Sequence, residues 1–317
     1  MPPRSPLPPR FGLSAAWMRT PDRDPADPRP WPTMREWLHA RLHEHIDVPD
    51  WLAQERFVYD SGAPVRADDV YAPHTFVWFH RELQDEAPVP GEMHVVHRDE
   101  RLVVIDKPAF LSTIPRGKHV QQSVVVRMRA ALDLPELSPL HRLDRVTSGL
   151  LIMATERRWR GAYQTMFQHG VVDKTYHALA PVCEDLTLPR IVKNHLTKRR
   201  GHLQAEVVAD APANAESLVE LESERDGAGI YRLTPRTGRT HQLRVHMNGL
   251  GVPISGDPLY PIDRDVAIDD FSTPLQLLAS GLTFVDPVDG TRRSFESVRT
   301  LPLLAATSTT TATAPQN

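Results

Sequence analysis

Residues 141–150 read HRLDRVTSGL and place one carboxylate among cationic side chains. Asp144 lies between Arg142 and Arg145, and the segment then continues into two hydroxyl residues, a glycine and an apolar run. In many proteins such an aspartate is an ordinary salt-bridge partner or the N-cap of a turn. It can also be a reactive carboxylate beside an anionic substrate, because arginines bind phosphate groups well. Other motifs must decide between these interpretations.

Two further motifs carry side chains of the same kind. The segment RTGRTHQLR at 236–244 combines arginines with a glycine and two threonines, which offer backbone and hydroxyl hydrogen-bond donors. The segment DKTYH at 173–177 places Tyr176 close to Lys174 in a predicted strand. An aspartate, several arginines and a tyrosine in three separate strand-edge motifs favour a shared chemical site over surface decoration.

Common types of catalytic and binding site do not fit these motifs. Neither HRLD nor HQLRVH has zinc-ligand spacing, and a chain with one cysteine cannot form a thiolate metal site. The TSG sequence around Ser148 lacks the first glycine of a G-x-S-x-G nucleophile turn. No glycine-rich nucleotide-binding pattern occurs in the chain. The remaining class is a reaction run by one carboxylate without a metal or cofactor.

The same residues resemble the RluA-type pseudouridine synthases. HRLDRVTSGLLIMA is similar to the family's H-R-L-D-x-x-T-S-G signature, which contains its catalytic aspartate. VVIDKPAFLSTIP, VVDKTYHAL and RTGRTHQLRVHMNGLGVPISGDPLY resemble further family segments in the expected order. The resemblance spans roughly residues 92 to 300. One departure is Phe110, which stands where many members have glycine, and it leaves the path of that loop open.

The resemblance implies an isomerase that converts uridine in RNA to pseudouridine without a cofactor or a metal. Asp144 is then the catalytic carboxylate, Arg239 its ion-pair partner, and Tyr176 the residue that stacks under the target base and helps to move the proton at carbon 5. Arg142 is expected to fill the space that the turned-out base leaves. The further substrate-binding residues are expected to be Arg145, Lys174 and Arg244. The route by which Asp144 acts stays open.

The elements that must position these residues are mainly strands. Strands are predicted on either side of the HRDER turn at 97–101, over 146–155 and over 174–182, and a hairpin-like pair over 216–238. Helices are predicted over 123–134 and over 240–251, the second capped by Thr240. This order favours an α+β fold with a mixed, largely antiparallel central sheet flanked by helices and loops.

Composition divides the chain into four parts. Residues 1–32 are proline-rich and are predicted to be a disordered arm, and 303–317 a disordered tail. Residues 33–85 are predicted to form a small α/β module, whose first helix is capped by Thr33. This module loosely resembles a small ribosomal-protein-type RNA-binding domain, and a purely structural cap is the alternative. The catalytic domain is predicted over 86–302.

Bulk properties restrict location and partners. The net charge is −3, so a basic face for RNA must be balanced by acidic surfaces elsewhere. Apolar runs such as 150–154 are too short to cross a bilayer, and the start lacks a signal-peptide core. With Cys183 as the one cysteine, we expect a cytoplasmic protein, a monomer by default.

The expected partner is structured ribosomal or transfer RNA, presented as a loop or stem-loop. The resemblance does not choose between these RNAs or identify the uridine. Two alternatives remain: an RNA-binding protein that has this fold and no activity, and a hydrolase that uses Asp144 on a glycosidic bond. The hydrolase is disfavoured because the signature motifs contain no second carboxylate.

Overall fold

The computed structural model describes residues 3–21, 31–83, 85–115, 117, 119–225 and 227–302. The chain divides into two compact units, and the boundary lies between Asp85 and Glu86. The tail predicted for 303–317 lies outside the described residues, as does the 22–30 part of the predicted arm.

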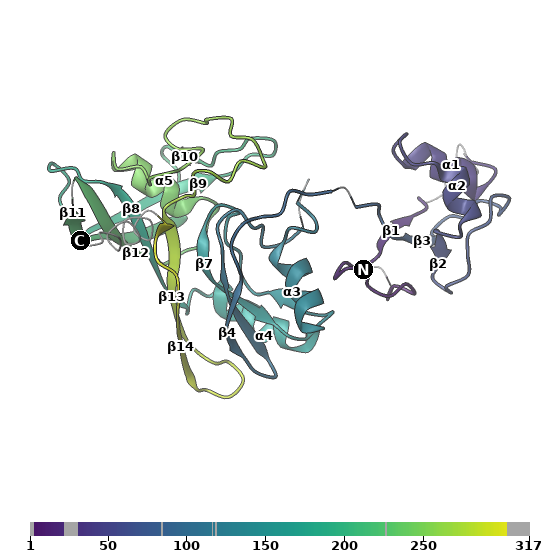
Figure 1. Cartoon of the computed structure of the whole chain (residues 1–317), viewed down its shortest axis with the longest axis horizontal. Helices are drawn as coiled ribbons and strands as arrows, with labels where there is room; N and C mark the ends of the chain where they lie inside the picture. The colour runs from purple at the N-terminus through teal and green to yellow at the C-terminus, as the bar shows by residue number, and fades with distance from the viewer. Residues whose placement is uncertain are drawn as a thin grey trace, which may run out of the picture. The chain divides into compact units, whose positions relative to one another are not determined.

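The first unit has a small antiparallel sheet in the order β1-β3-β2, with two short helices (Figure 1). Its elements are β1 (Ala16–Arg19), α1 (Met34–Arg41), α2 (Val48–Ala53), β2 (Val58–Tyr59) and β3 (Phe76–Phe79). The helix predicted after Thr33 is confirmed, because the Thr33 hydroxyl accepts a hydrogen bond from the Glu36 backbone N–H at 3.4 Å. Trp37, Leu38 and Trp51 form the middle of its apolar core.

The prediction that residues 1–32 form a disordered arm is wrong for the segment that contains β1. This strand pairs with β3, with Trp17 opposite Trp78, and the Trp17 ring centroid lies 5.4 Å from that of Phe76. The partner strand is distant along the chain, so no local pattern reveals the pairing. Proline flanks the strand and is absent from its four residues, which leaves each backbone N–H available.

The second unit is a large mixed sheet with three helices among its described residues. Its first elements are β4 (His94–Arg98), β5 (Leu102–Lys107), α3 (Val124–Leu132), β6 (Ser138–Pro139), β7 (Ser148–Ala154), α4 (Arg157–Gln168) and β8 (Asp173–Pro181). They are followed by β9 (Arg190–Thr197), β10 (Glu206–Val208), β11 (Ala215–Arg225), β12 (Ala228–Pro235), α5 (Gln242–Gly249), β13 (Leu277–Val285) and β14 (Arg292–Glu296). The predicted strands around the HRDER turn, over 146–155 and over 174–182 are confirmed, as is the helix over 123–134.

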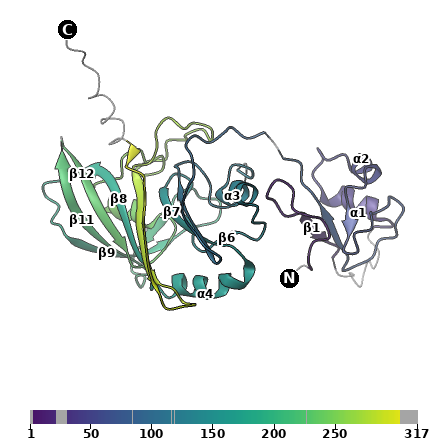
Figure 2. The same cartoon turned by 60° about the horizontal axis from the view of Figure 1, so that its bottom comes forward.

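The strand order is β10-β9-β11-β12-β8-β13-β7-β5-β4, with β14 paired to β13 and β6 paired to β7. Strands β7 and β13 are parallel, and the other pairs of this sheet are antiparallel. In both views α3 and α4 lie near β7, towards the opposite end of the sheet from β9 and β11 (Figure 1, Figure 2). The α+β fold with a mixed, largely antiparallel sheet is therefore confirmed.

Strands β5 and β7 are buried on both faces. Alternate residues such as Ile105 and Leu151 belong to one apolar cluster with helix α3 and helix α5. Their neighbours Val104 and Ile152 belong to a second cluster, with Tyr163 and other residues of α4. Because side chains alternate across a strand, two covered faces require the continuous apolar sequence LLIMA in β7. The Asp144 loop therefore runs directly into a rigid strand.

Gly149 allows β13 to approach β7 closely. Its φ is +109°, and a Cβ atom built there would lie 2.3 Å from the backbone oxygen of Ala279. Ala279 faces Gly149 on β7 and Tyr176 on β8, so one residue of β13 separates the two strands that lead to the site. The glycine of the TSG sequence is thus required by strand packing.

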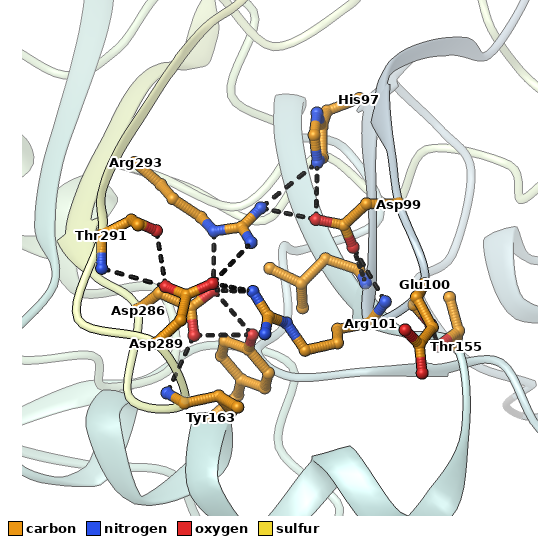
Figure 3. A network of polar contacts seen from close by, with 12 residues as sticks. His97, Asp99, Glu100, Arg101, Thr155, Tyr163, Asp286, Asp289, Thr291 and Arg293 are labelled. Carbon is orange, nitrogen blue, oxygen red and sulfur yellow. Dashed lines mark hydrogen bonds and ion pairs between the residues drawn. The ribbon is translucent and has the colours of Figure 1, made fainter.

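A charged network lies at the end of the sheet that is farther from Asp144 (Figure 3). The buried carboxylate of Asp286 accepts hydrogen bonds from the Tyr163 hydroxyl at 2.8 and 2.9 Å and pairs with Arg101 at 3.2 Å and Arg293 at 2.6 Å. Arg293 also pairs with Asp99 at 2.6 Å. The network joins the β4–β5 turn, α4 and the β13–β14 hairpin. These turns lie by the Ala154 end of β7, away from Asp144.

Candidate active site

The loop that carries Asp144 is held by backbone hydrogen bonds. The Thr113 hydroxyl donates to the Leu143 carbonyl at 2.8 Å and accepts from the Leu143 N–H at 3.2 Å. The Thr147 N–H donates to the Asp144 carbonyl at 3.1 Å, which forms the turn into β7. The Asp144 side chain remains 30% exposed. The loop therefore presents a carboxylate that both solvent and a substrate can reach.

Arg244 is the arginine that pairs with Asp144. It lies on α5, its side chain is 2% exposed, and its Nη1 is 3.4 Å from Asp144 Oδ2. Its Nε and Nη2 donate to the two carboxylate oxygens of Asp257 at 2.8 and 2.6 Å. A guanidinium held in this bidentate way cannot turn toward solvent. Arg244 therefore links the exposed carboxylate to a buried one.

The predicted pairing of Arg239 with Asp144 is wrong. Arg239 is exposed, and its Nε donates to the Asn214 carbonyl at 3.1 Å. The helix begins at Gln242, and His241 occupies its N-cap position with φ +57°, so the predicted cap at Thr240 is also wrong. This left-handed turn separates Arg239 from the helix face that carries Arg244. Arg244, predicted to bind substrate, is instead a buried partner of the carboxylate.

His241 is a site residue that sequence reasoning did not identify. Its Nε2 lies 3.9 Å from Asp144 Oδ2, and its Nδ1 lies 3.1 Å from the Tyr260 hydroxyl. Burial lowers the pKa of His241 to about 4, with Arg244 and Lys198 acting in the same direction against the carboxylates of Asp144 and Asp257. The ring is therefore neutral at pH 7.

Lys107 is a second residue that sequence reasoning missed. It ends β5 in full burial, and its Nζ donates to the carbonyls of Pro108, Leu111 and Arg145 at 3.0, 2.8 and 3.1 Å. Burial lowers its pKa to about 7, against the attraction of Asp144. The three bonds join the 108–111 loop to the residue after Asp144. A charged pair, Asp106 and Lys107, directly after the apolar run LVVI was the available signal.

Tyr176 lies on β8 and is mostly buried against the main apolar cluster. Burial raises the pKa of its phenol well above the usual range, and the negative charge of Asp144 adds to this effect. The phenol is therefore protonated at neutral pH. Lys174 on the same strand donates to the Thr237 carbonyl at 3.2 Å, which joins β8 to the 236–241 loop, and burial lowers the pKa of its amine.

The side chains of Arg142 and Arg145 differ in their exposure and in their contacts with the rest of the protein. Arg142 is exposed, and we find no hydrogen bond or ion pair of its side chain with the described residues. Arg145 is partly buried, its Nη1 donates to the Ile268 carbonyl at 3.2 Å, and its guanidinium carbon lies 5.7 Å from the Phe110 ring centroid. Arg142 can meet a substrate without breaking a contact, whereas Arg145 is already engaged.

Phe110 keeps the backbone path that glycine would allow. Its φ is +66°, in the left-handed region, and its side chain is buried. Its ring lies 5.4 Å from that of Phe271 and near Arg145. Packing of the ring offsets a backbone cost of order 1 kcal/mol. The path of this loop, which the sequence left open, is a left-handed turn at Phe110.

The described residues contain no group of three or more His, Cys, Asp or Glu side chains that could hold a metal ion. In the part of the chain that the structure describes, no helix has the length and apolar character needed to cross a membrane. The site consists of the partly exposed carboxylate of Asp144, the buried side chains of Arg244 and Lys107, the neutral ring of His241 and the phenol of Tyr176.

Comparison with known proteins identifies the class of protein that has this fold. Residues 101–249 match the family model described as RNA pseudouridylate synthase. The structure is similar to that of human RNA Pseudouridylate Synthase Domain Containing 4, with a TM-score of 0.51 and 22% identity over 70% of this chain and 94% of the human one. The fold is therefore that of the RNA pseudouridine synthases.

Sequence relatives narrow the class to one family. The chain is 30% identical to the Dual-specificity RNA pseudouridine synthase RluA of Vibrio parahaemolyticus, over 65% of this chain and 82% of the relative. It is 28% identical to the Ribosomal large subunit pseudouridine synthase D of Pseudomonas aeruginosa, over 80% of this chain and 84% of the relative. The chain belongs to the RluA-type family of RNA pseudouridine synthases. It is an isomerase that acts on RNA and converts uridine to pseudouridine.

Proposed function

We propose that this enzyme modifies one uridine in a structured loop or stem-loop of ribosomal or transfer RNA, with Asp144 as its catalytic carboxylate. The observation that carries the proposal is the convergence of Arg244, Lys107 and Tyr176 around Asp144 at the start of β7. We also propose that it works in the cytoplasm as a monomer. The single free cysteine, Cys183, suits a reducing compartment.

The reaction needs few groups. The bond from the anomeric carbon to ring nitrogen N1 breaks, the ring turns, and the same carbon bonds to C5. The proton displaced from C5 leaves, and N1 gains one, so no atom is added to the base overall. A carboxylate held by a fixed guanidinium meets the electrostatic demand of this exchange once bound RNA covers it from solvent.

Tyr176 fits the role of a stacking platform. A phenol whose pKa is raised by burial and by Asp144 keeps its proton at neutral pH. It can therefore lie under a base and pass a proton along, but it is not a ready-made phenolate base. Removal of the C5 proton then needs an acceptor that takes the phenol proton or takes the C5 proton directly. Asp144 is the candidate, because its charge acts on the Tyr176 phenol.

The choice of RNA rests on the relatives. One relative is named for dual specificity, and another for the large ribosomal subunit. The exposed basic segment 198–200, at the tip of the β9–β10 hairpin, offers phosphate contacts near His241. The first unit is proposed to add RNA contacts of its own, and a purely structural role is the alternative.

Arg142 is proposed to occupy the place of the uridine that turns out into the site. Its free, exposed guanidinium can stack on or bond to the bases that remain. Arg142→Ala should slow turnover on a stem-loop RNA about tenfold more than on a short unstructured RNA, because the few kcal/mol of unstacking arise in the stem-loop. Arg157→Ala on α4 is the control for loss of a surface charge. Equal losses on both RNAs would contradict the role.

The main test follows tritium. RNA from cells that lack the gene is labelled at C5 of uridine and incubated with wild-type protein or Asp144→Ala in the presence of a chelator. Release by the wild type alone is the expected result, because C5 loses its hydrogen only when it bonds to the sugar. No release by either protein would support an RNA-binding protein without activity. Release of free uracil would support a glycosidic hydrolase.

A further inference from the structure

A chain of polar contacts leads from the β9–β10 connection to Asp144. The Ala205 N–H donates to the Tyr260 hydroxyl at 2.7 Å, and this hydroxyl lies 3.1 Å from His241 Nδ1. The other nitrogen of the same ring, Nε2, lies 3.9 Å from Asp144 Oδ2. Ala205, Tyr260 and His241 come from three separate segments of the chain. Their contacts form one continuous line that ends at the Asp144 carboxylate.

The segment 257–260 holds both partners of Asp144. Asp257 binds Arg244 through two oxygens, and its Oδ1 also accepts from the backbone N–H groups of Leu259 and Tyr260 at 2.8 and 3.2 Å. The Tyr260 ring lies 5.2 Å from the Arg244 guanidinium carbon and meets the His241 ring edge-on. One short segment therefore fixes the cation and the imidazole together.

The Tyr260 hydroxyl has a single proton and two acceptors within reach. It can donate to the Ala205 carbonyl at 3.1 Å or to His241 Nδ1. If it donates to His241, the hydrogen of the neutral ring is on Nε2 and points toward Asp144. If it donates to Ala205, Nε2 carries a lone pair that faces the carboxylate. The negative charge of Asp144 favours the first arrangement.

We propose that Tyr260 and His241 are positioning residues for Asp144, with Tyr260 selecting the Nε2–H tautomer of His241 and that N–H orienting the carboxylate. The separation of 3.9 Å is longer than a hydrogen bond, and it shortens when RNA fills the site, as contacts of this kind do in substrate complexes. Ala205 belongs to the same β9–β10 connection as the basic segment 198–200. The proposal rests on Asp144 being the catalytic carboxylate.

Tyr260→Phe tests the hydroxyl with the ring retained. We expect the maximal single-turnover rate at saturating enzyme to fall about tenfold, and RNA affinity to change less than about twofold, since one hydrogen bond is lost away from the RNA. The matched control is Tyr231→Phe, which removes another hydroxyl that donates to a backbone carbonyl, that of Pro181, at 2.8 Å. A merely structural hydroxyl would make the two variants alike in rate.

His241→Gln and His241→Leu separate the N–H from the shape of the ring. Both carry the same left-handed backbone cost, but Gln places an amide N–H near the position of Nε2. We expect the Leu variant to lose about tenfold in maximal rate and the Gln variant to lose about threefold or less. Equal rates for Gln and Leu would overturn the proposal, and so would a wild-type rate for Tyr260→Phe.

Asp144→Ala, assayed alongside these variants, separates failure of the catalytic role of Asp144 from failure of the positioning roles alone. If Asp144→Ala keeps activity, the proposed catalytic role fails and the positioning roles fail with it. If Asp144→Ala is inactive while Tyr260→Phe, His241→Gln and His241→Leu keep the wild-type rate, the positioning proposal alone is wrong. Thermal melting of each variant shows whether a loss of rate comes from unfolding.

Discussion

Arg239 and Arg244 lie five positions apart in one motif and have opposite environments. One is exposed and bonded to a backbone carbonyl, and the other is buried between Asp144 and Asp257. Both arginines carry the same charge in the sequence, and family resemblance pointed to the first. The difference arises from the left-handed turn at His241, which a sequence pattern does not reveal. The type of partner was predicted correctly, and the particular residue was not.

Substitution of Arg244 and of Arg239 should have different effects on the rate of isomerisation. Arg244→Lys keeps a charge but cannot bind Asp257 in bidentate fashion, so we expect the maximal isomerisation rate to fall by about 30-fold or more, about 2 kcal/mol of barrier. Arg239→Ala should change that rate less than about threefold, because an exposed pair contributes little. Tritium release under single-turnover conditions measures both. A larger loss for Arg239→Ala would restore it as the partner of Asp144.

His141 gives a pH-dependent contribution to stability. Its Nε2 accepts from the Ile152 N–H at 3.1 Å, and its ring stacks on Phe167 at 4.6 Å. Burial lowers its pKa to about 3, with Lys174 adding to the effect. The unfolded chain binds a proton near pH 6.5, so between pH 6.5 and pH 3 it binds more protons than the native state. The contribution of His141 to stability is therefore fully present above pH 6.5 and is lost as the pH falls through this range.

His141→Gln should reduce the change in the free energy of unfolding with pH. Its amide oxygen can accept a hydrogen bond from the Ile152 N–H but does not titrate. We expect the free energy of unfolding of the second unit to change by up to about 1.4 kcal/mol less per pH unit between pH 6 and pH 4. Five of the six tryptophans lie before Asp85, so hydrogen exchange of β7 is the better measurement than fluorescence. Identical slopes would show that the ring is not neutral in the native state.

At the scale of elements, prediction succeeded where the pattern was local. Strand β7 has a continuous apolar run, and α3 has apolar residues at helical spacing, so both were predicted. Helix α4 was not predicted, because its buried side is narrow and comprises Tyr163 and Met166. Strand β1 was missed because its partner is distant in sequence. Pairing between distant segments decides such elements, and local composition does not.

Two glycines should respond to alanine in opposite ways. Gly149→Ala puts a Cβ against the backbone of Ala279, so we expect severe loss of stability in the second unit, several kcal/mol, since neither strand can move. Gly161→Ala lies on the exposed side of α4 with open space around it and should stabilise by up to about 1 kcal/mol. Melting temperatures of both variants check the prediction. A folded, active Gly149→Ala would disprove the close approach.

At the scale of the whole molecule, a net charge of −3 conceals segments of opposite charge. Strand β11 carries four glutamates, whereas the β9–β10 connection has Lys198, Arg199 and Arg200. Arg142, in the loop that carries Asp144, is a further exposed cation. From the net charge alone, a basic face for RNA had to be balanced by acidic surfaces elsewhere. The distribution of charge, which depends on the fold, agrees with RNA as the partner.

RNA binding should therefore depend steeply on salt. Each phosphate contact contributes a slope of about −0.7 to −0.9 in log affinity against log salt, so Lys198→Gln should reduce the slope by about that amount. Arg158→Gln is the control, because Arg158 pairs with Glu100 and Glu156 near the Ala154 end of β7. Filter binding across salt concentrations measures the slope. An affinity that does not change with salt would contradict phosphate recognition by this hairpin.

The position of β13 has a consequence for synthesis of the enzyme. This strand lies between β7 and β8, yet residues 277–285 leave the ribosome after almost every other strand of the sheet. Until then the nascent chain holds two partial sheets, each with an unpaired apolar edge, and pairing them late is intrinsically slow. Loss of β13 therefore leaves β8, which carries Tyr176, and β7, into which the Asp144 loop runs, without the strand that joins them. A ribosome-stalled chain that exposes only residues 1–276 should be bound by chaperones and should crosslink to them through the open edges of β7 and β8.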